Sequence, residues 1–248
     1  MSLMPNLKER SRDLELVDQP GDWSADLAGT FAEMAWTNRL FGGLGSLRRF
    51  LQPVLSLRNA RILDVGTGTG ETYRELGNWA RDRGAEWRLV ALDLSPRILA
   101  LGDGLRTRSA PGPGKEPDLP GPDSLLGCAG NAVALPFPAK TFDAVICLQT
   151  LHHLSDAEAK SAIGEMVRVS RNLVVVSDLR RGAVPYWAAR GLASAVWRNP
   201  LTRHDGPLSV RRGFTSRELK RLGDKGGATA CQVHRHGLFR LVLAWATP

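Results

Sequence analysis

Long apolar runs are absent from this sequence of 248 residues. No stretch reaches the roughly 18 apolar residues that a membrane span needs, and the first residues do not join a basic region to an apolar one. We therefore expect neither a membrane span nor a signal peptide, and we predict a cytoplasmic protein. Because 43% of the residues are hydrophobic, the chain can still fill a sizeable core as one large domain.

Cysteine is scarce. The three cysteines, Cys128, Cys147 and Cys231, are odd in number, lie far apart and have apolar neighbours. This usage is typical of reduced thiols in a core and favours neither disulfides nor a metal site, so we expect no metal ion.

A concentrated basic region is also missing, although the net charge is +8. The arginines are spread along the whole chain, and no basic run is interleaved with aromatic residues. Proteins that bind nucleic acid usually gather their positive charge in a patch or stripe. The diffuse charge favours an ordinary basic surface, and we do not expect a nucleic-acid partner.

Strand and helix patterns alternate along most of the chain. Apolar runs predict strands at residues 62–65, 87–92, 125–129, 142–148, 172–177, 228–234 and 238–245. Helical patterns occur within residues 24–55 as two helices and at 72–83, 96–105, 156–169 and 215–224, while the Pro/Gly-rich residues 109–124 predict an exposed loop. The alternation predicts an α/β fold with a doubly wound, mostly parallel seven-stranded sheet that ends in an antiparallel hairpin.

Three glycines alternate directly after the first predicted strand, in the stretch "LDVGTGTGE" that contains Gly66, Gly68 and Gly70. Such a turn lies at the carboxyl edge of a parallel sheet, where ligands bind. A dinucleotide fingerprint has glycines at its first, third and sixth positions, but the sixth position here is Glu71. Its carboxylate would repel a pyrophosphate at the helix N-terminus, so the pattern favours a ligand without phosphates.

Two aspartates narrow the ligand class further. Asp93 ends the second predicted strand, where an ionised carboxylate can accept hydrogen bonds from both hydroxyls of a ribose. Asp64 lies just before the glycine turn and, with Glu71, predicts an acidic wall that suits a cationic ligand. A purely structural alternative stays open, in which the glycines form a tight connection and Asp93 caps the next helix.

The chain from about Arg61 to the final hairpin resembles the class I S-adenosylmethionine-dependent methyltransferases. Three stretches carry the resemblance: "LDVGTGTGE", "ALDLS" with Asp93, and "GNAVALPFPAKTFDAVICLQTLHHL" at residues 130–154. Within the last stretch, Gln149 to His153 is similar to the small-molecule branch with ubiquinone, menaquinone and natural-product methyltransferases. It lacks the Asn/Asp-Pro-Pro-aromatic motif of many nucleic-acid and protein amino-methyltransferases.

The resemblance implies S-adenosylmethionine as cofactor, S-adenosylhomocysteine as product and a Rossmann-like methyltransferase fold. It implies a cofactor site made of Asp64, Gly66, Thr67, Gly68, Gly70, Asp93, Leu94, Asn131, Ala132, Gln149 and Thr150. The family more often has Asp at position 131, but the side-chain oxygen of Asn131 can still accept from an adenine amino group.

The resemblance also divides the chain into an N-terminal helical lid at residues 1–56 and a cofactor-binding methyltransferase domain at residues 57–248. Trp36, Arg39 and Arg180 are candidate residues on the substrate side. The N-terminal helices could instead be packing elements. We expect the pairs His204-Asp205 and Arg211-Arg212 to lie in a solvated connection.

Polar residues follow two strands that should be neighbours in such a sheet. His152 and His153 come shortly after the fourth predicted strand, and Asp178 follows the fifth. One imidazole, with His152 preferred, could donate to Asp178 while its other nitrogen accepts a proton from the acceptor hydroxyl. The alternative is that both histidines pack against the sheet and Asp178 caps the next segment.

The expected reaction is methyl transfer to a small-molecule acceptor by in-line attack on the sulfonium methyl. Resemblance favours O-methylation of an aromatic or polyketide-like acceptor, with C-methylation of a quinone precursor as the alternative. A nucleic-acid methyltransferase and a cofactor-binding protein without catalysis are the remaining rivals. The sequence does not indicate the oligomeric state.

Overall fold

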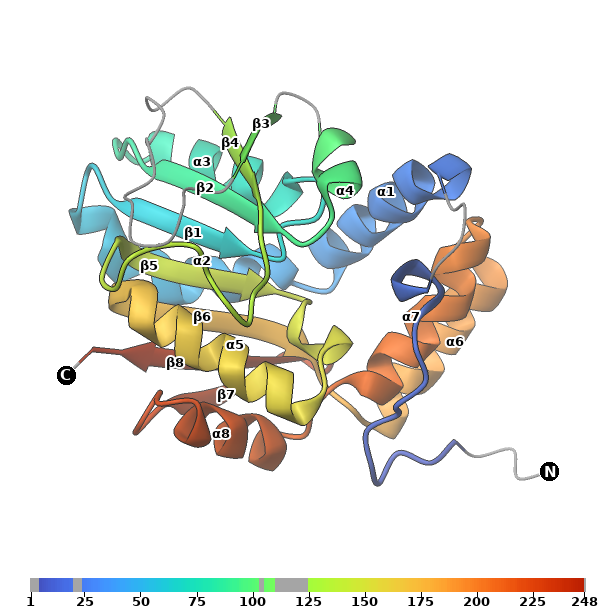
Figure 1. The fold of residues 1–248 in the computed structure, drawn as a ribbon. Coiled ribbons are helices and arrows are strands. Elements are labelled where there is room, and N and C mark those ends of the chain that lie inside the picture. The colour runs from blue at the N-terminus through green and yellow to red at the C-terminus, as the bar shows by residue number, and fades with distance from the viewer. Residues whose placement is uncertain (1–4, 20–23, 103–104, 110–124, 248) are drawn as a thin grey trace.

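The computed structural model describes residues 5–19, 24–102, 105–109 and 125–247. A central sheet carries helices on both faces, with a further group of helices beyond the carboxyl ends of its strands (Figure 1). Within the described residues the strand order is β3-β4-β2-β1-β5-β6-β8-β7. The strands are β1 Arg61–Val65, β2 Arg88–Asp93, β3 Leu105–Ser109, β4 Leu125–Ala129, β5 Phe142–Leu148, β6 Ser170–Leu179, β7 Gln232–His236 and β8 Arg240–Ala246.

The predicted doubly wound topology is confirmed. The strands from β3 to β6 are all parallel, whereas β8 pairs antiparallel with β6 and β7 antiparallel with β8. One strand joins the seven that the sequence predicts. This strand, β3, has the sequence Leu-Arg-Thr-Arg-Ser and lies at the edge of the sheet, where a strand does not need a continuous apolar run. The predicted loop at residues 109–124 falls, apart from Ser109, outside the described residues.

Most predicted helices are also confirmed. They are α1 Ser24–Leu40, α2 Gly43–Leu51, α3 Glu71–Arg81, α4 Pro96–Ala100, α5 Asp156–Val169 and α8 Ser216–Lys225, with a 3-10 turn η2 Gln52–Ser56 after α2. The predicted N-terminal residues of two helices are also confirmed. Ser95 accepts from the amide of Ile98 at the start of α4, and Thr215 forms a capping box with Glu218 at the start of α8. Among the described residues, no helix is long and apolar enough to cross a membrane.

Alternate residues of the buried strands face the two sides of the sheet. Leu63 and Val65 of β1 belong to a core with α5 and α8, and Ile62, directly before Leu63, belongs to a core with α2 and α3. Burial on both faces fixes the register of the parallel strands. The carboxyl ends of β1, β2, β5 and β6 are therefore held together at one edge, where the functional side chains lie.

Two long helices beyond this edge were missed by the sequence analysis: α6 Ala183–Ala195 and α7 Pro200–Arg212. The expectation that residues 204–205 and 211–212 lie in a solvated connection was wrong. They belong to α7, and Asp205 and Arg212 are only 6% and 4% exposed. Pro207 lies inside α7 directly after a glycine, and these two residue types interrupt the pattern by which a helix is recognised.

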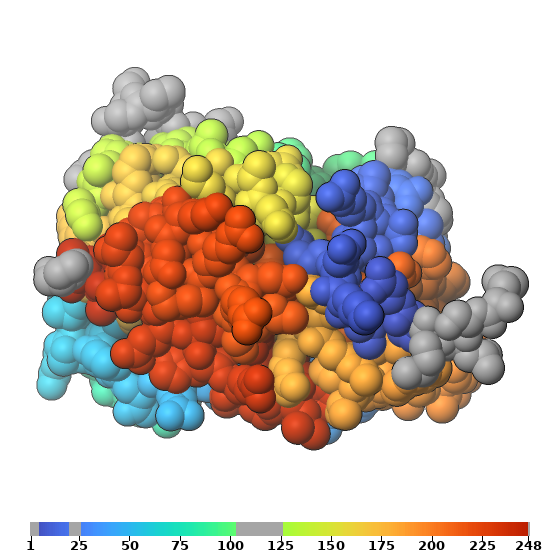
Figure 2. Space-filling view, turned by 90° about the horizontal axis from the view of Figure 1, so that it is seen from below, coloured from blue at the N-terminus to red at the C-terminus, as the bar shows by residue number. Residues whose placement is uncertain are grey.

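The N-terminal segment lies against α7, as Figure 2 shows for the blue and orange parts of the surface. It contains a short 3-10 turn, η1 Leu16–Asp18, whose amides at Leu16 and Val17 donate to the carboxylate of Asp205. We call η1, α1, α6 and α7 together the cap. Helix α2 is not part of it, because Leu47 and Leu51 are buried in the sheet core. In the described part of the predicted lid, the residues that line the cavity lie within 14–19 and 27–41.

Candidate active site

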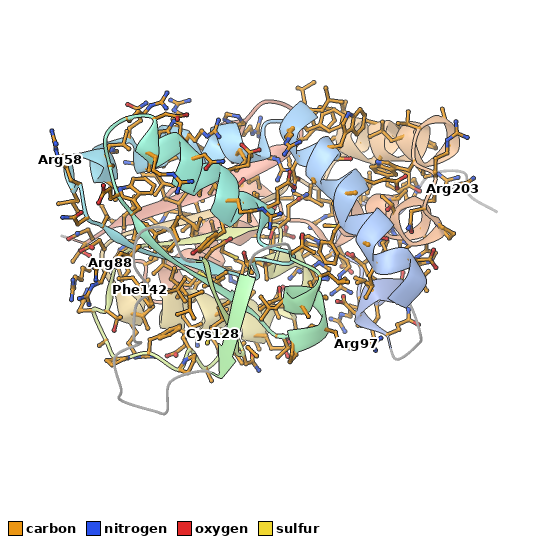
Figure 3. The ribbon with its side chains drawn as sticks, turned by 90° about the horizontal axis from the view of Figure 1, so that it is seen from above. Arg58, Arg88, Arg97, Cys128, Phe142 and Arg203 are labelled. Atoms are coloured by element: carbon orange, nitrogen blue, oxygen red, sulfur yellow. The ribbon has the colours of Figure 1, made fainter. Side chains whose placement is uncertain are left out.

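A cavity of about 700 Å³ lies between the carboxyl edge of the sheet and the cap. Figure 3 shows α1 running between α4, which carries Arg97, and the helices α6 and α7, the second of which carries Arg203. The sheet side contributes the residues that the sequence predicts for the cofactor: Asp64, Gly66, Thr67, Gly68, Asp93, Leu94, Asn131, Ala132, Gln149 and Thr150. Gly70 does not line the cavity but ends the turn as the N-cap of α3.

The glycine turn requires glycine for two separate reasons. Gly66, Gly68 and Gly70 have φ angles of 72°, 60° and 76°, in the left-handed region that side chains disfavour. A Cβ on Gly66 would also lie 2.1 Å from Oγ1 of Thr150, and one on Gly68 would lie 2.8 Å from the ring of Phe31. The bare backbone of the turn is therefore packed between the end of β5 and α1.

Asp93 connects this turn to the end of β2. Its carboxylate accepts from the amide of Gly68 at 2.9 Å and from the amide of Ser95 at 3.0 Å. Each oxygen keeps a further lone pair, so the carboxylate can still accept from a ligand in the cavity. Burial raises the pKa of Asp93, and the two amide hydrogen bonds oppose this shift.

Two more carboxyl groups make this wall acidic, as predicted. Asp64 is 1% exposed and accepts from the hydroxyl of Thr67 at 2.7 Å, and burial raises its pKa to about 7. Glu71 also has a raised pKa because of burial, which the guanidinium of Arg39 at 2.7 Å opposes. A cation between these carboxyl groups would favour their ionised forms.

The next part of the cavity is formed by residues after β2 and β4. Leu94 is 71% exposed although it is a large apolar residue, and it lines the cavity beside Asn131 and Ala132. The side-chain oxygen of Asn131 accepts from the amide of Val133 at 3.0 Å and so fixes its own turn. This corner offers an apolar surface and one amide to a flat ligand.

Gln149 and Thr150 lie at the end of β5, facing the glycine turn. Gln149 has a φ of 53°, which is unusual for a residue with a side chain, and its amide donates to the carbonyl of Ser177. Its side-chain oxygen is buried without a hydrogen-bond partner among the described residues. Backbone strain and an unpaired polar atom at one position are features of ligand-binding sites.

The histidine and aspartate that the sequence predicts as a pair are in contact. His152 belongs to the 3-10 turn η3 Leu151–His153 that follows β5, and Asp178 lies near the end of the neighbouring strand β6. Nδ1 of His152 lies 2.7 Å from Oδ1 of Asp178, and the side chains are 2% and 0% exposed. Burial alone would raise the pKa of Asp178, but the imidazole beside it lowers the pKa below its usual value. The other ring nitrogen of His152, Nε2, faces the carboxylate of Glu15.

The N-terminal segment supplies two carboxylates that the sequence analysis missed. Glu15, which is 3% exposed, lies 3.6 Å from Nε2 of His152 and 3.9 Å from Nε2 of His153. Asp18 lies 2.8 Å from Nδ1 of His153. Burial would lower the pKa of His153, but Glu15 and Asp18 raise it to about 9. Neither acid belongs to a sequence motif; the only signal is an acidic pair within the apolar stretch "LELVD".

The structure does not bring Trp36, Arg39 and Arg180 to the cavity lining. Trp36 is 46% exposed, Arg39 pairs with Glu71 and Glu75, and Arg180 donates to the carbonyl of Leu238. The opposite face of α1 lines the cavity instead, through a stripe that includes Leu27, Phe31, Met34 and Asn38, together with Leu192 of α6, Val210 of α7 and Trp197 between them. Helical spacing places these α1 residues on one face and Trp36 on another.

Comparison with known proteins agrees with this geometry. Residues 63–174 match the family described as "Methyltransferase domain". The chain is 31% identical over 188 residues to a demethylmenaquinone methyltransferase of Beutenbergia cavernae, an alignment that covers 72% of this chain and 68% of that protein. It is 34% identical over 111 residues to a demethylmenaquinone methyltransferase of Roseiflexus castenholzii, covering 45% of this chain but only 38% of the relative.

A solved structure shares the fold over almost the whole chain. Magnesium protoporphyrin IX methyltransferase from Synechocystis PCC 6803, solved with bound S-adenosylmethionine, superposes with a TM-score of 0.51 at 13% identity and covers 93% of this chain and 86% of that one. This chain belongs to the class I S-adenosylmethionine-dependent methyltransferases. S-adenosylmethionine is the cofactor of this family.

Proposed function

We infer that the enzyme methylates a small, largely apolar acceptor through an ionisable hydroxyl group, and that the acceptor binds between the His152–Asp178 pair and the cap. One observation carries this inference: the same cavity extends from the glycine turn to His152 and is closed over by apolar residues of α1, α6 and α7. Among the described residues, the cavity lining contains two arginines, Arg97 and Arg240, and no lysine, which is a small basic content for a nucleic-acid channel.

The two parts of the cavity have different roles in this proposal. The cofactor half consists of the glycine turn, Asp64, Asp93, Leu94, Asn131 and Ala132, with Gln149 and Thr150 at its inner end. The bare turn would accept the methionine part, Asp93 the ribose hydroxyls, and the Leu94 corner the adenine. The acidic wall of Asp64 suits the positive charges of the cofactor, which carries no phosphate.

The acceptor half consists of Glu15, His152, His153 and the apolar cap residues. When bound, the cofactor supplies an electrophilic methyl carbon, which leaves its sulfur as the acceptor oxygen bonds to it. Asp178 keeps the Nδ1 proton of His152 in place, so that Nε2 is free to accept the proton of the acceptor hydroxyl. The apolar cap excludes water and so strengthens the electrostatic interactions at this point.

O-methylation of an aromatic or polyketide-like acceptor is the reaction that a positioned base at a hydroxyl supports best. C-methylation of a quinone precursor is the second candidate, favoured by the similarity to demethylmenaquinone methyltransferases over 188 residues. The same base serves both reactions, because a phenolate can attack through its oxygen or through an adjacent ring carbon.

Transfer of a labelled methyl group to a panel of alkyl phenols, resorcinols and demethylated quinols tests the proposal. We expect turnover with apolar hydroxyaromatic acceptors, and mass spectrometry with NMR of the product identifies oxygen or carbon as the methylated atom. Bulk tRNA serves as the competing acceptor. Turnover with tRNA alone, or with no hydroxyaromatic compound of the panel, would contradict the proposal.

A further inference from the structure

We propose that Glu15, His152 and His153 form a binding site for a divalent transition-metal ion at the acceptor half of the cavity. The two Nε2 atoms and the Glu15 carboxylate face one point, and one ligand atom from each residue lies within 4.8 Å of the other two. Two histidines and one carboxylate are a common donor set for Zn²⁺, Mn²⁺ and Fe²⁺, whereas Mg²⁺ and Ca²⁺ prefer oxygen ligands alone.

The distances fit an ion better than they fit direct hydrogen bonds. The separations of 3.6 Å and 3.9 Å between Glu15 and the two imidazoles are too long for hydrogen bonds. Metal bonds of about 2.0–2.2 Å place two ligands of one ion roughly 3–3.5 Å apart, so a small contraction of the three side chains would bring them into coordination.

The carboxylate of Glu15 itself indicates that a partner is needed. It is 3% exposed, and its Oε1 atom accepts no hydrogen bond from the described residues. The guanidinium of Arg212 approaches it only to 3.7 Å and donates instead to the carbonyls of His152 and His153. A buried carboxylate oxygen without a hydrogen bond is costly, and a coordinated cation would remove this cost.

Both imidazoles are oriented as metal ligands are. Nδ1 of His152 is held by Asp178 at 2.7 Å and Nδ1 of His153 by Asp18 at 2.8 Å. A carboxylate at one ring nitrogen places the proton there and directs the lone pair of the other nitrogen towards a metal. In this structure two such carboxylate–histidine pairs converge on the same third carboxylate.

The local charge is also consistent with a divalent ion. Glu15, Asp18 and Asp178 carry three negative charges when ionised, and Arg212 is the guanidinium that contacts Glu15. Arg240 is a second buried guanidinium, whose charge acts on Asp178. With neutral imidazoles, the negative charges of the three carboxylates still exceed the positive charges of these two arginines, which favours a bound cation. Protonation of His153 is the competing explanation, and it requires no metal.

Three protein ligands leave coordination positions open, as in catalytic metal sites. Because the cluster lines the cavity, the acceptor hydroxyl fits as a further ligand, and coordination would lower its pKa and release its proton to water before methyl transfer. In this role His152 holds the ion and does not accept the proton. This role rests on the proposed acceptor, whereas metal binding itself does not.

Calorimetric titration of the full chain with Zn²⁺ and with Mn²⁺, after treatment with a chelator, tests the site. We expect one equivalent to bind, and Glu15→Gln and His153→Ala to weaken binding at least tenfold. Asp18→Asn should weaken it by about 10–100-fold through loss of the orienting bond. The control is His234→Ala, which removes a histidine of β7 outside the cavity. Unchanged affinity for S-adenosylmethionine shows that each variant is folded.

Absence of binding, or binding that Glu15→Gln and His153→Ala leave unchanged, would overturn the proposal. Either result would favour a protonated His153 in place of a bound ion. The two proposals can fail separately. Full turnover of hydroxyaromatic acceptors by the metal-free enzyme would contradict the catalytic role of the ion and leave the proposed function intact. Stoichiometric metal binding without turnover of any such acceptor would support the metal site and contradict the proposed function.

Discussion

The cofactor half and the acceptor half of the cavity differ in how they are held together. The glycine turn is fixed by backbone hydrogen bonds to β2, with the amides of Gly66 and Thr67 donating to the carbonyl of Leu92. The acceptor half is fixed by long side chains: Arg212 of α7 and Arg10 of the N-terminal segment both donate to the carbonyl of His152. One half is thus held by the backbone at the ends of neighbouring strands, and the other by side chains that come from segments about 60 and 140 positions away.

Because of this difference, we expect substitutions to affect cofactor binding and turnover separately. Changes in the local turn should act on cofactor affinity, because backbone positions are altered there. Changes among the side chains of the acceptor half should act on turnover and leave cofactor affinity unchanged. Four experiments test this separation: the expected effect on turnover is the largest, the two effects on cofactor affinity are similar in size, and the pH dependence is the smallest.

His152→Ala should reduce turnover by about 10²–10⁴-fold at unchanged affinity for S-adenosylmethionine, because it removes the group at the acceptor hydroxyl. Asp178→Asn should also reduce turnover and should change the pH profile, because the amide no longer fixes the Nδ1 proton. Single-turnover rates and calorimetric affinities measure the two effects separately. If neither variant loses even tenfold in rate, the enzyme works by proximity and the pair is structural.

Gly66→Ala should weaken cofactor binding by roughly tenfold to a hundredfold, corresponding to about 1.4–2.8 kcal/mol. A matched control is Gly84→Ala, since Gly84 has a φ of 75° but nothing lies within 4 Å of its added Cβ. In Gly84→Ala the added methyl group strains the backbone but meets no neighbouring atom. We therefore expect a lower melting temperature with unchanged cofactor affinity. Equal affinities of the two variants would argue against the close approach of Gly66 to Thr150 as a requirement.

Asp93→Ala should weaken binding of S-adenosylmethionine by roughly 1.5–3 kcal/mol through loss of hydrogen bonds to a charged group. Part of this loss would come from the turn itself, because Asp93 also accepts from the amide of Gly68. Titration with S-adenosylhomocysteine in parallel should give a similar loss, since both ligands carry the same ribose. If a folded variant keeps its affinity, Asp93 does not bind the ribose hydroxyls.

The smallest expected effect is a pH dependence of cofactor binding below about pH 7. Burial raises the pKa of Asp64 to about 7, so the carboxyl is protonated at lower pH. A cationic ligand favours the ionised form, and affinity should therefore fall as the pH drops through this value, by up to about tenfold per unit. Asp64→Asn should abolish the dependence in calorimetry at pH 6 and pH 8. A wild-type affinity that is constant over this range would contradict the assignment.

The same contrast explains what the sequence could predict. The glycine turn, Asp93 and the Asn131 corner are short local patterns at strand ends, so their grouping follows once the parallel order is known. The contact between His152 and Asp178 was predictable for the same reason, because β5 and β6 are adjacent in the sheet. The roles of these residues stay predictions that the variants above test.

The acceptor half could not be predicted in this way. Helix α7 contains Pro207 and does not show a clear apolar pattern, and Glu15 lies in a segment without periodicity. Trp36 and Arg39 were chosen by residue type, although the apolar stripe with Phe31 and Met34 pointed to the correct face of α1. Side chains that come into contact only in the folded cap leave no local pattern in the sequence.

Hydrogen–deuterium exchange with and without S-adenosylhomocysteine tests the central claim most directly. The account predicts slower exchange at residues 64–72, 92–98 and 130–132, with little change in α6 and α7 until an acceptor is added. Protection that is confined to α6 and α7 on addition of S-adenosylhomocysteine alone would contradict the division of the cavity into a cofactor half and an acceptor half.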